Sequence, residues 1–381
     1  MLRPPPLSVY IHLPWCVHKC PYCDFNSHEK NQATFQIDKK NYLNAIIKQI
    51  NLADIDGRKI HSIFFGGGTP SLFDPDEINQ ILIAIKKKYS LNPSCEVTLE
   101  ANPGTIDLPY FGGYQQIGIN RLSLGIQSFN NKYLKKLGRI HSADDAYIVA
   151  ERANQIFHRV NLDLMFALPD QTLNDLENDI ETALKLSPQH ISYYHLTIEP
   201  NTLFHRFPPK LPDDDLSAEF QEHIFKKLSM HHYEHYETSA HTKEGGACLH
   251  NLNYWQFGDY LGFGAGAHSK ITKNDEIKRL SCYKNPQQYS GQANNENFYI
   301  EQKTITQNDS IFEFMLNALR LNEGFQINLF ESRTGINFNN IAPEVNEALE
   351  RGLIILTDDI IKPTNLGKNY LNDLLQIFLR E

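Results

Sequence analysis

The sequence predicts an α/β protein: a partial (β/α)6 barrel followed by a small C-terminal α+β module. Six short β-rich segments recur within the first 200 residues, and amphipathic helical segments lie between them. Strands that alternate with helices form parallel sheets joined by right-handed crossovers. Six units are fewer than the eight of a closed barrel, so we expect an open one.

The expected strands are rich in β-branched and aromatic residues. They span residues 7–13, 60–65, 95–99, 119–124, 159–166 and 190–198. The segments between them repeat apolar residues at helical spacing, which marks one buried face. These helices are expected near 34–52, 75–89, 107–116, 142–157 and 172–186.

The pattern changes after the sixth strand. A Pro-rich stretch spans 200–215, and a His-, Tyr- and Gly-rich region spans 232–270. From about residue 306, helical segments precede a short hairpin and a last helix, which is typical of a winged-helix-like module. We therefore expect three parts, namely the barrel 1–200, an extension 201–300 and the C-terminal module 301–381.

Composition excludes several classes of function. Lys and Arg number 36 and Asp and Glu 45, a formal net charge of −9, whereas nucleic-acid binding needs a basic surface. No apolar run approaches the roughly 18 residues of a membrane helix, and residues 1–6 lack the apolar segment of a signal peptide. We expect a cytoplasmic protein with no nucleic-acid partner and no transmembrane segment.

Glycine-rich and polar motifs follow the expected strands at their C-terminal ends. They are Gly66-Gly67-Gly68-Thr69-Pro70, Glu100-Ala101-Asn102-Pro103-Gly104, Gly125-Ile126-Gln127-Ser128, and Asp163 within the fifth strand. The carboxyl ends of parallel strands share one face, where such folds build their sites. We expect these motifs to converge there.

Three of the six cysteines, Cys16, Cys20 and Cys23, follow the first strand with spacings of three and two residues. This clustering favours metal binding over disulfides. A four-iron cluster normally takes four thiolates, so three would leave one iron open for an exogenous ligand. The alternatives are a Cys3His zinc site with His12, His18 or His28, and unligated cysteines.

Taken together, these motifs resemble the radical S-adenosylmethionine (SAM) superfamily. The segment from Tyr10 to Cys23 is similar to its cluster loop, and more narrowly to the branch that holds oxygen-independent coproporphyrinogen III dehydrogenase and the HemW haem chaperones. The likeness covers nearly the whole chain. It implies the radical SAM partial barrel, a [4Fe–4S] cluster on Cys16, Cys20 and Cys23, and SAM on the open iron.

The resemblance also implies the SAM contacts. Gly67, Gly68 and Thr69 would lie beside the methionyl amine, Glu100 near the sulfonium charge, Gln127 and Asp163 near the ribose, and Arg139 at the methionyl carboxylate, with Tyr10 as a nearby participant in a radical reaction. Two alternatives stay open. Asp163 could only bond a neighbouring strand, and Arg139 could be an exposed helix-end cation.

Two features favour the HemW branch. Phe25 stands where the decarboxylating enzyme's pattern has a fourth cysteine, and His250-Asn251-Leu252-Asn253-Tyr254-Trp255 matches the HemW pattern HNxxYW. The resemblance implies haem binding, with His250 as axial ligand and Tyr254 and Trp255 against the porphyrin. The alternative is that His250 and Trp255 pack between domains. Cys248 is either a second ligand or a bystander.

The sequence therefore predicts a radical-SAM-type haem chaperone that carries a cluster and SAM and delivers haem to haem-dependent respiratory apoproteins. Such recipients would allow peripheral membrane association through partners. The alternatives are the coproporphyrinogen dehydrogenase, which decarboxylates oxidatively in porphyrin metabolism, and a zinc-stabilised module. Whether the chain is an enzyme stays open. The glycine segment 262–267 is expected near the SAM or substrate cavity rather than at a dinucleotide.

Overall fold

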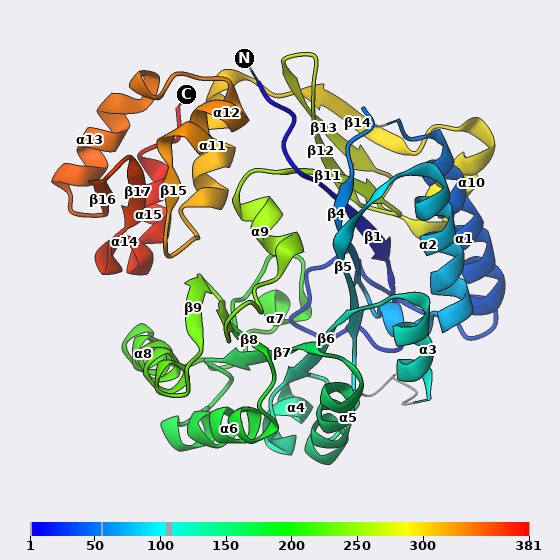
Figure 1. Ribbon diagram of the computed structural model, residues 1–381. Helices are drawn as coiled ribbons and strands as arrows, with labels where there is room; N and C mark the ends of the chain where they lie inside the picture. Colours follow the sequence, from blue (N-terminus) through cyan, green and yellow to red (C-terminus); the bar gives the residue numbers. More distant parts are fainter. Residues whose placement is uncertain (1, 55, 104–108, 381) are drawn as a thin grey trace.

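The computed structural model describes residues 2–54, 56–103 and 109–380, and one large sheet organises most of them (Figure 1). Its twelve strands run in the order β14-β13-β12-β11-β1-β4-β5-β6-β7-β8-β10-β9. The end strands β14 and β9 do not pair with each other within the described ranges, so the barrel is open, as predicted.

The parallel part of the sheet contains the six predicted strands. They are β1 (Leu7–Leu13), β4 (Ile60–Gly67), β5 (Leu91–Ala101), β6 (Arg121–Gln127), β7 (Arg159–Phe166) and β8 (His190–His195). The structure adds β11 (Asp259–Phe263), which pairs in parallel with the other side of β1. The parallel region is therefore one strand wider than the sequence predicted.

Helices cover the outer face of this parallel region. They are α1 (Phe35–Leu52), α2 (Pro75–Lys88), α3 (Tyr110–Ile117), the short α4 (Asn131–Lys136), α5 (Ala143–Ile156) and α6 (Leu173–Leu186). Capping boxes begin α2, α5 and α6, at Asp74, Ser142 and Thr172. Gly104 and the start of the helix predicted at 107–116 lie outside the described residues.

The segment predicted as an extension adds to both ends of the same sheet. At one end lie α7 (Leu203–Arg206), α8 (Asp214–Met230), β9 (Glu234–Glu237) and β10 (Ala240–Thr242). After α9 (Leu249–Trp255) come β11, β12 (His268–Lys273), β13 (Glu276–Cys282), α10 (Pro286–Gly291) and β14 (Tyr299–Thr304) at the other end. Because β14 passes residue 300, the three-part division remains a proposal.

The C-terminal module has its own hydrophobic core, which includes Phe314 and Phe330. Its elements are α11 (Gln307–Ala318), β15 (Phe325–Gln326), α12 (Ile327–Thr334), α13 (Ala342–Glu350), β16 (Ile354–Thr357), β17 (Ile360–Pro363), α14 (Asn365–Asn369) and α15 (Leu371–Gln376). Its three strands pair in the order β15-β17-β16, so the module is the predicted small α+β unit. Figure 1 shows α9 between this module and the large sheet.

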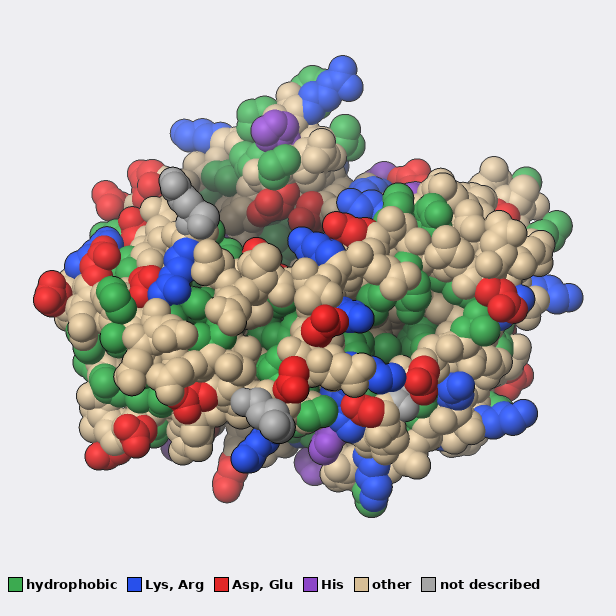
Figure 2. All heavy atoms as spheres, turned by 90° about the horizontal axis from the view of Figure 1, so that it is seen from above, with side chains coloured by type: hydrophobic (Ala, Val, Ile, Leu, Met, Phe, Trp, Pro, Cys, Tyr) green, Lys and Arg blue, Asp and Glu red, His purple; other side chains and the backbone are tan. Residues whose placement is uncertain are grey.

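The surface carries charges of both signs. On the face drawn in Figure 2, Lys and Arg side chains are interspersed with Asp and Glu, without a continuous basic stripe. Across the described ranges, no helix is both long enough and apolar enough to cross a bilayer.

Candidate functional site

The predicted motifs meet at one cavity of about 650 Å³, whose lining runs from the cysteine loop beyond β1 to Arg121 and His190 at the starts of β6 and β8. Its wall includes every predicted site residue except Trp255. These are Tyr10, Cys16, Cys20, Cys23, Gly67, Gly68, Thr69, Glu100, Gln127, Arg139, Asp163, His250 and Tyr254. For the cysteine, glycine, Glu100, Gln127 and Asp163 motifs convergence follows from topology, because each lies on or just beyond a parallel strand. Arg139, after α4, and the two α9 residues reach the cavity from outside these strands.

The three clustered cysteines lie in a loop that folds back on itself. β2 (Trp15–Cys16) pairs with β3 (His28–Glu29), and the Cys23 amide donates to the Cys20 carbonyl over 3.1 Å. All three thiols are half-buried. Burial raises the pKa of Cys16, and the charges of Cys20 and Cys23 raise it further, so three bare thiolates here would repel one another.

The zinc alternative finds no support in this geometry. Within the described part of the chain, no three His, Cys, Asp or Glu side chains are placed to hold a single metal ion. Tetrahedral zinc requires all its ligands within about 2.3 Å of one centre. Thiolates that each bind a different iron of a cluster can lie farther apart.

The glycine motif packs tightly against the cysteine loop. A Cβ on Gly67, whose φ is 115°, would lie 2.5 Å from the His12 ring, and one on Gly68 would lie 2.6 Å from the Trp15 carbonyl oxygen. The amides of Gly68 and Thr69 donate to Leu13 and Trp15, each over 2.8 Å. The glycines are therefore needed to bring the end of β4 against the cysteine loop, a packing reason that sequence reasoning did not supply.

Two of the carboxyl groups that line the cavity, Glu100 and Asp163, are the predicted SAM contacts. Burial, and secondarily the charge of Asp163, raise the pKa of Glu100 to about 8, although the Gly67 amide donates to it over 3.1 Å. Burial also raises the pKa of Asp163. Asp163 accepts a hydrogen bond from Ser123 Oγ on the neighbouring strand β6 over 2.8 Å. It therefore makes the strand-to-strand contact that the alternative expected, and it also lines the cavity.

Arg139 turns inward rather than toward solvent. One Nη donates to Asn102 Oδ1 over 2.8 Å and to the Gly125 carbonyl over 2.6 Å, and the other lies 3.7 Å from Cys20 Sγ. The exposed-cation alternative is therefore not supported. Nearby, Gln127 ends β6 with a left-handed φ of 68°, a strained backbone that directs it to the cavity wall.

Tyr10 is tied to His12 on the same strand. His12 Nε2 lies 2.9 Å from the Asn26 carbonyl, which can only accept, so Nε2 carries the proton and Nδ1 accepts from Tyr10 over 3.0 Å. The glycine segment 262–267 lies behind this strand and lines none of the cavity. A Cβ on Gly264 would lie 2.5 Å from the His12 carbonyl oxygen, so the segment supports β1 instead of bordering the cavity as expected.

The histidine of α9 faces the cavity from a buried position. His250 is 2% exposed, its ring stacks on Phe64 with centroids 4.9 Å apart, and Tyr254 meets it edge-on at 5.0 Å. Burial lowers the pKa of His250 to about 3, so the imidazole is neutral. Its Nε2 is buried and finds no hydrogen-bond partner among the described residues.

Trp255 lies outside the cavity wall that His250 and Tyr254 line, and its place beside a porphyrin stays a prediction. Tyr254 lies four residues after His250 and shares its helix face, whereas Trp255 lies five residues after it and points elsewhere. The Arg320 guanidinium of the C-terminal module lies 4.4 Å from the Trp255 ring centroid. Trp255 therefore has the contact with the C-terminal module that the packing alternative expects, whereas His250 both packs on Phe64 and lines the cavity.

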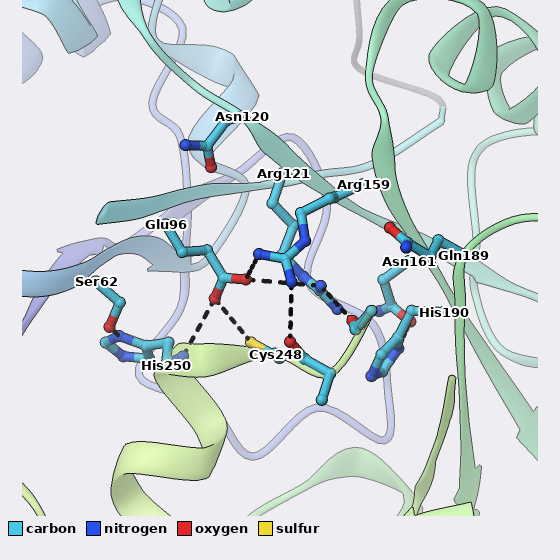
Figure 3. Close-up of polar contacts among 12 residues, drawn as sticks. Ser62, Glu96, Asn120, Arg121, Arg159, Asn161, Gln189, His190, Cys248 and His250 are labelled. Atoms are coloured by element: carbon cyan, nitrogen blue, oxygen red, sulfur yellow. Dashed lines mark hydrogen bonds and ion pairs between the residues drawn. The ribbon is translucent and has the colours of Figure 1, made fainter. Parts of the chain in front are cut away.

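Sequence reasoning missed a buried charge network at the N-terminal end of α9 (Figure 3). Glu96 lies 2.9 Å from Arg159 and 3.7 Å from Arg121, and it also accepts from the His250 amide over 3.2 Å and the Cys248 thiol over 3.6 Å. Burial raises the pKa of Cys248 to about 12, so it stays a thiol. The sequence did contain a signal for this network. Glu96, Arg121 and Arg159 each lie at or near the start of an expected strand, where a charged residue is unusual enough to suggest a partner.

Comparisons with known proteins show which family the chain resembles. The model of the radical SAM superfamily matches residues 10–183, and that of the HemN C-terminal domain matches 305–368. The haem chaperone HemW of Haemophilus influenzae is 45% identical, and that of Escherichia coli 42%, each alignment covering 100% of both chains. HemW of Bacillus subtilis is 34% identical over 98% of this chain and 99% of its own.

Among solved structures, coproporphyrinogen III oxidase (HemN) of Escherichia coli, described as a radical SAM enzyme, superimposes with a TM-score of 0.83. The match covers 99% of this chain and 90% of that one at 21% identity. At this identity the likeness shows the shared fold alone.

Proposed function

The chain belongs to the HemW family of haem chaperones within the radical SAM superfamily, and on that premise we propose that it binds haem beside α9 and delivers it to haem-dependent apoproteins. The observation that supports this proposal is the buried, neutral His250, whose Nε2 has no partner within the described ranges. An unpaired buried polar atom is costly, and a neutral imidazole nitrogen is a common ligand of haem iron.

Superfamily membership implies a [4Fe–4S] cluster and SAM. We propose that Cys16, Cys20 and Cys23 hold the cluster. The donors fit it: three half-buried thiols border one cavity, where a cationic metal centre would relieve the repulsion between thiolates. When bound, the cluster and SAM would supply one-electron chemistry.

The SAM contacts proposed from the resemblance suit the chemistry of the cavity wall. Arg139 is directed inward, which suits the methionyl carboxylate. Glu100 offers a carboxyl group to the sulfonium cation. Gly67, Gly68 and Thr69 adjoin the cysteine loop, Gln127 and Asp163 suit ribose hydroxyls, and Tyr10 remains the proposed participant in a radical step.

The coproporphyrinogen dehydrogenase reaction is the second candidate, because every SAM-binding residue proposed for it lines the cavity. Phe25 argues against it. Its ring is 63% exposed at the place of the missing fourth cysteine, and a phenyl ring supplies neither a ligand nor a thiol. We further propose that the chain works in the cytoplasm and reaches membrane-bound recipients through partners.

Anaerobic haem titration of the cluster-reconstituted protein, read by absorbance, tests the main proposal. The wild type should bind about one equivalent, and His250→Ala should lose this binding or change its spectrum. His241→Ala is the matched control, since it removes an imidazole that is 1% exposed and lies outside the cavity wall. Equal weak binding by all three proteins would refute haem ligation by His250, and sustained coproporphyrinogen conversion would favour the second candidate.

A further inference from the structure

The other ring nitrogen of His250 is held by two serines of the barrel. His250 Nδ1 lies 2.9 Å from Ser62 Oγ, and Ser62 Oγ donates to Ser8 Oγ over 2.7 Å. Ser8 and Ser62 are register partners on β1 and β4, and both are 0% exposed. Figure 3 shows Ser62 beside the His250 ring.

Counting protons decides which nitrogen is protonated. A serine hydroxyl has one proton, and Ser62 gives that proton to Ser8, so Ser62 must accept at its contact with His250. His250 Nδ1 is therefore the donor. A neutral imidazole carries only one N–H, so its Nε2 has a free lone pair.

We propose that Ser62 is a positioning residue, which fixes His250 in the Nδ1–H tautomer and thereby presents the Nε2 lone pair to the cavity. The identity of the acceptor as haem iron rests on the proposed function, but the tautomer does not. Free histidine favours the opposite tautomer, in which Nε2 is protonated and cannot bind a metal. Hydrogen bonds to the remote nitrogen of a ligating histidine commonly serve this purpose.

Other contacts hold the ring independently of Ser62. Phe64 stacks on one face of the imidazole, Tyr254 meets its edge, and the His250 amide donates to Glu96. Loss of the Ser62 hydroxyl should therefore leave the ring in place while releasing its tautomer. Substitution of Ser62 is therefore expected to change the tautomer of His250 without disturbing the packing of α9.

The test measures the tautomer directly, without haem. Protein labelled with ¹⁵N in its histidine rings is examined by long-range ¹H–¹⁵N correlation, and the His250 signals are identified by their loss in His250→Gln. We expect the Nδ1–H pattern in the wild type and in Ser62→Thr, which keeps a hydroxyl, and its loss in Ser62→Ala. An Nε2–H pattern in the wild type, or an unchanged pattern in Ser62→Ala, would overturn the proposal.

A haem titration of the same variants separates this inference from the proposed function. Ser62→Ala should bind haem roughly 10-fold or more weakly with a shifted Soret band, and Ser62→Thr should restore wild-type behaviour. Wild-type protein with the expected tautomer but no haem binding would refute the chaperone proposal alone. Wild-type affinity and spectrum in Ser62→Ala, with haem still lost in His250→Ala, would refute the role of Ser62 alone.

Discussion

Binding of SAM should release a proton from Glu100. Because burial and the charge of Asp163 raise the Glu100 pKa to about 8, this carboxyl is mostly protonated at pH 7 in the SAM-free protein. A sulfonium cation beside it favours the carboxylate, so binding shifts the group to its ionised form. At pH 7 a pKa near 8 corresponds to release of about 0.9 proton, and at pH 9 to about 0.1.

Isothermal titration of the cluster-reconstituted protein with SAM, in buffers of different ionisation enthalpy, measures this number. The slope of observed enthalpy against buffer enthalpy gives the protons released. SAM affinity should also rise with pH below 8 and level off above it, since protons compete with the cation only while Glu100 is protonated. Glu100→Gln should abolish most of the release at pH 7. A slope near zero in the wild type at pH 7, or an equal slope in the variant, would refute the reasoning.

Three further predictions concern the architecture around the cavity. Glu96→Gln should lower the free energy of unfolding by about 3–5 kcal/mol in denaturant titrations, because Arg121 and Arg159 lose the carboxylate that they share. A loss of less than about 1 kcal/mol would contradict this prediction. Gly68→Ala should lower bound iron and SAM because its Cβ clashes with backbone, whereas Gly112→Ala, with nothing within 4 Å, should bind both normally. Trp255→Leu should leave the haem affinity within about 3-fold of wild type. It should lower the free energy of unfolding by about 0.5–1 kcal/mol, because the contact with Arg320 is lost. A large loss of haem affinity would instead indicate that Trp255 contacts haem.

The sequence by itself determined the open parallel barrel and the convergence of its motifs. Both depend on local order: alternating strand and helix patterns imply right-handed crossovers, and these place every strand's carboxyl end on one face. Cys16, Glu100 and Asp163 could therefore be assigned to one cavity without knowledge of their distances. The family resemblance supplied the identity of the ligands, which pattern alone does not encode.

Tertiary structure alone decided which groups meet across long separations. Ser62 and His250 are 188 residues apart, and Glu96 reaches α9 from 154 residues away, so no local periodicity links them. The register of β1 with β4 turns Ser62 inward, and the parallel addition of β11 to β1 fixes where α9 crosses the barrel. The sequence motif contained both His250 and Trp255, but packing gave them different surroundings, because residues five apart on a helix face different neighbours.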